Sequence, residues 1–131
     1  MVRKLLIITI IWAVIILILS GIPGSSLPKA PLFNIPHLDK WIHAALYFPL
    51  AIFIVAEFDL SRNLIISLAA PFFTMLIVAL YGGLIELAQD HLFVNRSADV
   101  VDLAFDLFGG LFGITFYYLL LKGWFRKQSR R

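Results

Sequence analysis

Residues 5–22 read LLIITIIWAVIILILSGI, a stretch that contains no charged side chain. A helix that crosses a lipid bilayer needs about 20 predominantly apolar residues, and this stretch comes close to that length. Arg3 and Lys4 precede it, as in a secretory signal, but Ser20-Gly21-Ile22-Pro23 offers no obvious small-x-small cleavage site. The stretch therefore predicts a retained membrane-spanning helix.

The composition of the whole chain favours the same class of protein. Of its 131 residues, 61% are hydrophobic and 15% are charged, whereas a water-soluble domain of this size needs more polar side chains to cover its surface. We expect one integral membrane domain over residues 1–131. The absence of cysteine excludes disulfide and thiolate chemistry. The net charge is +3, but the cationic tail from Lys122 to Arg131 directly follows an apolar segment, which is typical of an anchor in anionic lipid and argues against nucleic acid as a partner.

Three further apolar stretches follow along the chain, and each is long enough to span a bilayer: about 38–57, 64–89 and 99–122. Pro49 lies inside the first of them, where it predicts a kink, and Pro71 lies inside the second. Ser61 or Asn63, in the polar turn before residue 64, is a candidate cap for the following helix. Prolines and glycines between residues 23 and 36 predict a non-helical loop. The four stretches together predict an all-α fold, a four-transmembrane-helix bundle.

The distribution of positive charge predicts the orientation. Cationic segments tend to remain cytoplasmic, and most lysines and arginines lie at the two termini or in the 59–63 turn: Arg3, Lys4, Arg62, Lys122, Arg126, Lys127, Arg130 and Arg131. We therefore expect a multi-pass protein of the cell membrane with both termini in the cytoplasm. The opposite, outer half then carries three cations (Lys29, Lys40 and Arg96) against six acids, namely Asp39, Glu86, Asp90, Asp99, Asp102 and Asp106.

Ionisable side chains in lipid are costly and usually face a bundle interior, where they act on an ion or a substrate. In the second stretch, Asp39, His43 and Tyr47 recur every four residues and share a helix face. Asp39 is either an N-cap or a site residue. His43 lies deeper and suits a general base, a proton relay or a metal ligand.

The third stretch contributes a second polar face formed by Glu86, Gln89 and Asp90, close to Gly82 and Gly83. A carboxylate that ends an apolar run is protonated, paired with a cation or bound to a metal. The cations available to Glu86 are three: Arg96, Lys40 and protonated His43. The alternative to a functional role is a structural ion pair between helices. Tyr81 is either part of this site or part of the core.

In the fourth stretch, Asp99, Asp102 and Asp106 occupy positions i, i+3 and i+7. Asp99 is a candidate cap, whereas Asp102 and Asp106 are expected to point into the bundle, where like charges raise each other's pKa unless a cation lies between them. The same face continues with small residues that favour close helix packing: Gly109, Gly110 and Gly113.

An ordered set of short motifs covers nearly the whole chain: Ile22-Pro23-Gly24-Ser25-Ser26-Leu27-Pro28, Asp39-Lys40-Trp41-Ile42-His43 with Tyr47, Tyr81-Gly82, Glu86-Leu87-Ala88-Gln89, Arg96-Ser97-Ala98-Asp99 with Asp102, and Asp106-Leu107-Phe108-Gly109-Gly110. The set resembles the VanZ-like membrane proteins, named for an accessory product of glycopeptide-resistance clusters. The resemblance implies a role in the bacterial cell envelope and, for the namesake, reduced susceptibility to teicoplanin-type glycopeptides. It supplies no established mechanism. One position departs from the pattern, because the family commonly has Asn where this chain has Asp106.

The first functional hypothesis is an enzyme at the outer leaflet that acts on a lipid or a lipid-linked cell-wall substrate. The candidate catalytic residues are His43, Glu86, Asp102 and Asp106. The last three are also candidate ligands for a divalent metal, with no spacing that selects one. The candidate substrate-binding residues are Asp39, Lys40, Tyr47, Tyr81, Gln89 and Arg96, of which Lys40 and Arg96 would hold a phosphate.

Two other functions fit the same sequence. A non-catalytic protein that binds membrane lipid, a lipid-linked precursor or a lipoglycopeptide would shield the target of an antibiotic, and it would need a lipid-facing groove. A proton or ion relay would use the Asp/Glu/His chain. We expect the relay least, because the polar residues do not continue into the inner half of the helices.

Overall fold

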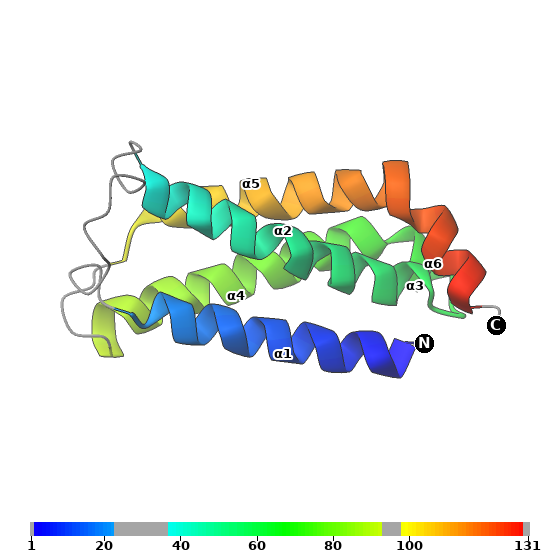
Figure 1. Ribbon diagram of the computed structural model, residues 1–131, viewed down its shortest axis with the longest axis horizontal. Coiled ribbons are helices and arrows are strands. Elements are labelled where there is room, and N and C mark those ends of the chain that lie inside the picture. The colour runs from blue at the N-terminus through cyan, green and yellow to red at the C-terminus, as the bar shows by residue number, and fades with distance from the viewer. Residues whose placement is uncertain (1, 23–36, 93–97, 130–131) are drawn as a thin grey trace.

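The computed structural model describes residues 2–22, 37–92 and 98–129, and this part of the chain is helical with no strand (Figure 1). Four helical segments are long and apolar enough to cross a membrane. The elements, in chain order, are α1 (Val2–Ser20), α2 (Leu38–Asp59), α3 (Leu64–Leu68), α4 (Ala70–Leu92), α5 (Val100–Phe116), a π-helical turn η3 (Tyr117–Leu121) and α6 (Lys122–Ser129). The predicted all-α four-helix bundle is confirmed.

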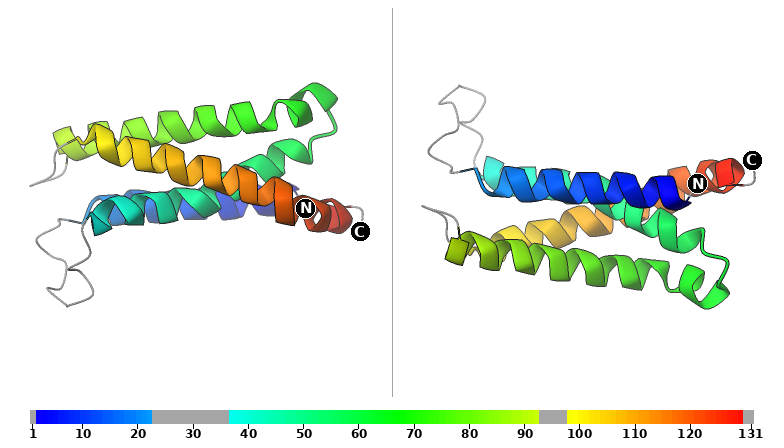
Figure 2. Two further views of the ribbon diagram at one scale, coloured as in Figure 1. Left: turned by 90° about the horizontal axis from the view of Figure 1, so that it is seen from above. Right: turned by 90° about the horizontal axis from the view of Figure 1, so that it is seen from below.

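The helices form a bundle in which α2 and α5 make the most extensive contact. Helices α5 and α1 lie on opposite sides of the α2/α4 pair, as the views from above and below show (Figure 2). The start of α1 and the whole of α6 lie at one end, which we call the terminal end (Figure 1). The starts of α2 and α5 and the end of α4 lie at the other, which we call the polar end.

Several predicted helix boundaries are wrong in detail. The stretch predicted at 64–89 is interrupted at Ala69 into α3 and α4, and α4 continues to Leu92. Pro71 is the second residue of α4, a position where its missing N–H and fixed φ are tolerated. The predicted Asn63 cap is confirmed, because its side chain accepts hydrogen bonds from the backbone N–H groups of Ile65 and Ile66. The other three helices also run past their predicted limits: α1 begins at residue 2, α2 ends at 59 and the last helical segment ends at 129. The loop predicted over 23–36 lies outside the described residues.

Glycines of α5 allow two neighbouring helices to approach closely. A Cβ at Gly109 would meet the carbonyl oxygen of Ala44 and would lie 2.8 Å from its Cα, and a Cβ at Gly113 would meet the backbone of Phe48 on the same helix, α2. Gly110 faces the other way, with a side-chain atom of Val78 on α4 at 3.0 Å from its Cβ position. The predicted architectural role of these glycines is confirmed.

Helix α1 is less buried than the other spanning helices, and hydrogen bonds to α2 and α4 help to attach it. Only 11% of its membrane-spanning window is buried. The Trp12 indole N–H donates to the carbonyl of Leu46 on α2 at 2.8 Å. From α4, Tyr81 donates to the carbonyl of Ala13 at 2.6 Å. In a lipid environment such hydrogen bonds contribute to helix association where hydrophobic burial contributes little.

Candidate functional site

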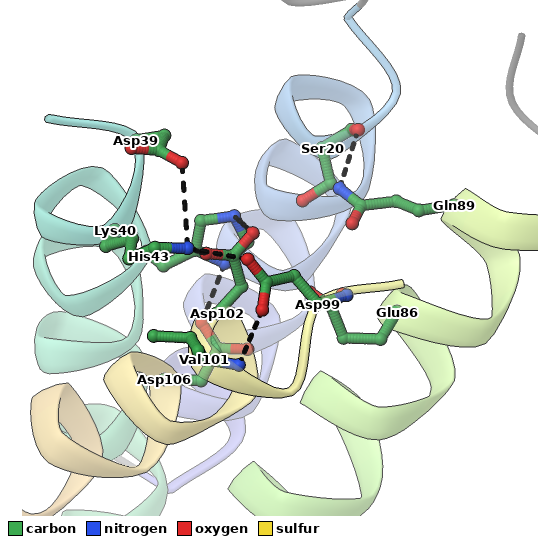
Figure 3. A network of polar contacts seen from close by, with 10 residues as sticks. All are labelled: Ser20, Asp39, Lys40, His43, Glu86, Gln89, Asp99, Val101, Asp102 and Asp106. Carbon is green, nitrogen blue, oxygen red and sulfur yellow. Dashed lines mark hydrogen bonds and ion pairs between the residues drawn. The ribbon is translucent and has the colours of Figure 1, made fainter. Parts of the chain in front are cut away.

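All four predicted catalytic side chains lie close together inside the polar end of the bundle (Figure 3). His43 comes from the second turn of α2, Glu86 from the last third of α4, and Asp102 and Asp106 from the first two turns of α5. Their exposed fractions are 8%, 5%, 8% and 0% respectively. Buried ionisable groups need partners, so their hydrogen bonds indicate which of them act together.

The centre of the cluster is formed by His43, Glu86 and Asp106. Nδ1 of His43 lies 2.9 Å from Oδ1 of Asp106. One ligand atom from each of these three residues lies within 4.8 Å of the others, which is compact enough for a single metal ion. An imidazole with two carboxylates is a common donor set for Zn²⁺ and Mn²⁺.

Unpartnered atoms mark the same place. In the described part of the chain, three buried side-chain polar atoms have no hydrogen-bond partner: the hydroxyl oxygen of Tyr47, Oε1 of Glu86 and Oδ2 of Asp106. Tyr47 is 1% exposed, and its hydroxyl interacts electrostatically with both carboxylates. Because most buried polar atoms in proteins have a partner, three unpartnered ones in a single cluster indicate that a cation or polar ligand belongs between them.

Asp102 is directed to Lys40 and is not one of the three residues whose ligand atoms converge. The Lys40 ammonium lies 2.8 Å from Asp102, 2.7 Å from Asp99 and 3.8 Å from Asp39. The compact group beside Glu86 and Asp106 thus contains His43, where the sequence predicted Asp102. Nε2 of His43 and Oδ2 of Asp102 are 3.8 Å apart. The phosphate-binding role expected for Lys40 is not supported, since three carboxylates already surround its charge. Arg96, the other expected phosphate ligand, lies outside the described residues.

Asp99 connects the cluster to the start of α5. Its side chain accepts a hydrogen bond from the backbone N–H of Val101 at 2.8 Å, so the predicted cap is confirmed. The pKa of Asp99 lies below its ordinary value, mainly because its carboxylate accepts a hydrogen bond from the Lys40 ammonium and secondly because it accepts one from the Val101 N–H. The backbone N–H of Asp99 donates to Oε2 of Glu86 at 2.7 Å, which fixes one oxygen of Glu86 and leaves the other free.

Asp39 is not an N-cap. The cap position of α2 is His37, in the left-handed conformation at φ 58°, and the His37 side chain makes no capping hydrogen bond. Asp39 lies one turn above the cluster with its side chain 62% exposed, beside Lys40. It can therefore add negative charge at the mouth of the site without taking part in its centre.

The other predicted residues of α4 hold helices together. Gln89 is 1% exposed and donates to the carbonyl of Ser20 at 3.0 Å, so it ties α4 to α1. Tyr81 does the same through Ala13, and its ring lies 6.2 Å from the ring of Tyr47. Asp90 lies one helical turn after Glu86 on α4, but its side chain is 49% exposed and lies 3.6 Å from His91, so it is outside the buried cluster.

A further buried acid, which we did not predict as structurally important, lies at the terminal end. Asp59 is 4% exposed and accepts hydrogen bonds from the Tyr117 hydroxyl at 3.0 Å and from Arg126 at 3.1 and 3.2 Å. Lys122 lies 3.4 Å away. The basic residues after the fourth stretch could have indicated an ion pair with Asp59. The π-helical turn that contains Tyr117 could not be predicted from the sequence pattern.

Comparison with known proteins adds no relative. The chain matches no protein-family model, and no curated protein and no solved structure is significantly similar to it.

Proposed function

We propose that this protein is a VanZ-like enzyme of the bacterial cell membrane, which uses a divalent cation held by His43, Glu86 and Asp106 to act on a lipid or lipid-linked cell-wall substrate. The observation that carries the proposal is the group of three unpartnered buried atoms on Tyr47, Glu86 and Asp106. Each of the two carboxylates has one buried oxygen without a hydrogen-bond partner, which is unfavourable in the bundle interior, and a bound cation would compensate it.

The charge around the cluster favours a cation over any anion. Among the residues that the structure describes, five acids contribute to the cluster at the polar end together with two basic side chains, Lys40 and His43; the acids are Asp39, Glu86, Asp99, Asp102 and Asp106. A divalent cation bound here would polarise an ester or phosphoryl oxygen and lower the pKa of a bound water. Tyr47 would then donate a hydrogen bond to an oxygen of the substrate.

A conduction path is less well supported. Between the polar end and Asp59, the core of the bundle is filled by buried apolar side chains, among them Ala51, Val55, Val78 and Ile114. A polar cluster that ends on an apolar core suits chemistry at one membrane face better than transport through the bundle.

Catalysis predicts a chemical difference between cells that make the wild-type protein and cells that make the Glu86→Gln variant. We expect a lipid or cell-wall precursor to appear, or to disappear, only with the wild-type protein, because the variant loses a cation ligand. The measurement is mass spectrometry of envelope lipids and precursors at matched protein levels. The matched control is Asp90→Asn, which removes an exposed acid from the same helix and should behave as wild type. If the profiles of wild type and Glu86→Gln coincide while both lower teicoplanin susceptibility equally, the protein shields a target and catalysis is excluded.

The proposed orientation places the polar end outside and both termini in the cytoplasm, as the cation distribution suggests. Because the chain has no cysteine, single cysteines report accessibility without background. His37→Cys, at the polar end, should react with a membrane-impermeant maleimide on intact cells. Ser129→Cys, at the terminal end, should react only after the cells are opened. The reverse pattern would contradict the orientation.

A further inference from the structure

A groove of about 440 Å³ runs between α4 and α5 on the outside of the bundle. Its lining is apolar over most of its length, with Leu84 and Leu87 on α4 and Leu103 on α5, and it includes Glu86 and Asp99. Its volume lies within the range of about 300–1,000 Å³ that is usual for small-ligand sites. The groove therefore shares one residue, Glu86, with the candidate site.

Two adjacent glycines on α4, Gly82 and Gly83, have different surroundings. Only Gly82 is required by the packing of its neighbours. A Cβ at Gly82 would lie 2.8 Å from Oδ2 of Asp106, so this glycine makes room for the cluster. A Cβ at Gly83 would meet nothing within 4 Å, and Gly83 lines the groove. Alanine is the better helix former and would fit at residue 83. The glycine there leaves space along the groove that no part of the described chain fills.

The surroundings of the groove define its occupant. It lies on the membrane-spanning parts of both helices, and its outer residues Leu80, Leu84 and Val100 are 59%, 62% and 81% exposed. In a bilayer this face contacts the acyl chains of phospholipids. The part of α4 from Ala79 to Leu87 is roughly 12 Å long at 1.5 Å per residue. An acyl chain in the groove would bring a phosphate head to the end of the groove at Glu86, where the proposed cation would attract its negative charge.

We propose that the groove between α4 and α5 binds an acyl chain of an anionic phospholipid and presents its phosphate head to the cluster of His43, Glu86 and Asp106 from within the bilayer. This inference rests on the proposed function, for which it names the substrate class and the route of entry. A lateral route agrees with the position of Gly83, which lines the groove and leaves space there.

The test uses the full-length protein in nanodiscs that contain phosphatidylglycerol with a photoactivatable diazirine in one acyl chain. Crosslinks mapped by mass spectrometry should concentrate on residues 79–87 and 100–103. Gly83→Leu should reduce them at least about tenfold, because its side chain would fill the groove, whereas Gly83→Ala should reduce them little. Gly123→Leu, at a glycine of α6 whose Cβ position is also open, is the control for a general effect on folding.

Labelling that is equal in wild type and Gly83→Leu, or that spreads evenly over the outer face of α1, would overturn the proposal. Preferential labelling by a prenyl-phosphate probe would overturn the choice of an acyl chain. Mn²⁺ binding is measured on the same samples and should be unchanged by Gly83→Leu. A protein that shows groove labelling but no Mn²⁺ binding would contradict the proposed function and leave the groove assignment standing, so the two failures are distinguishable.

Discussion

Glu86→Gln is expected to abolish high-affinity binding of a divalent cation by the purified protein. The glutamine keeps the volume of the side chain and can still accept the hydrogen bond from the Asp99 backbone N–H, but it removes the negative charge beside His43 and Asp106. Loss of a partner that merely orients a metal ligand typically lowers affinity 10–100-fold. Loss of a ligand itself should therefore lower it at least about 100-fold. The measurement is titration of chelator-treated protein with Mn²⁺ or Zn²⁺, followed by calorimetry or by the Mn²⁺ resonance signal.

Two variants distinguish the ligand set in the structure from the set predicted by sequence. Asp106→Asn, which introduces the amide common in the family that the sequence resembles, should weaken cation binding as Glu86→Gln does, because Asp106 would contribute a ligand atom. Asp102→Asn should retain the cation, because Asp102 is bound to Lys40. If Asp102→Asn loses the cation while His43→Ala keeps it, the ligands are Glu86, Asp102 and Asp106 after all. Equal affinity in every variant would remove the metal site.

Gly109→Val is expected to produce the largest loss of stability among single substitutions in the bundle. The new side chain would meet the backbone of Ala44, whose Cα would be 2.8 Å from a Cβ at this position, and a helix backbone cannot rotate away as a side chain can. Overpacking of a core typically costs about 1–3 kcal/mol and occasionally more. Because α2 and α5 would have to separate along their whole contact, we expect at least about 3 kcal/mol here.

The stability change is measured by reversible unfolding in mixed micelles or by thermal denaturation in detergent. The control is Gly83→Ala, which adds a Cβ into open space on the neighbouring helix and should leave the midpoint unchanged or raise it slightly. Since Ala44 follows His43 directly, Gly109→Val should also weaken cation binding, even though no ligand is removed. An unchanged midpoint for Gly109→Val would contradict the close α2–α5 packing.

Hydropathy and charge spacing were sufficient to predict the broad architecture. The number of spanning helices follows from apolar length, and the buried faces at His43, Asp102 and Asp106 follow from helical periodicity. Asn63 and Asp99 were recognisable as caps because each is a polar residue directly before an apolar run. A cap is a hydrogen bond within one segment, and the face of a helix follows from the spacing of residues in that segment. Both could therefore be predicted without knowledge of the other helices.

The partners across helices were decided by the tertiary structure alone. Periodicity places Asp102 and Asp106 on one face of α5, but it does not say which of them lies level with His43 and which with Lys40. That choice depends on the relative height and rotation of α2 and α5, which the contacts of Gly109 and Gly113 with the α2 backbone determine. The same holds for Gln89 and Tyr81, whose polar groups bond to α1 and stay out of the site. Asp102 and Asp106 lie about one helical turn apart, which is a rise of about 5.4 Å. Hydrogen bonds and metal bonds act over about 2–3 Å, so this rise is enough to give the two aspartates different partners.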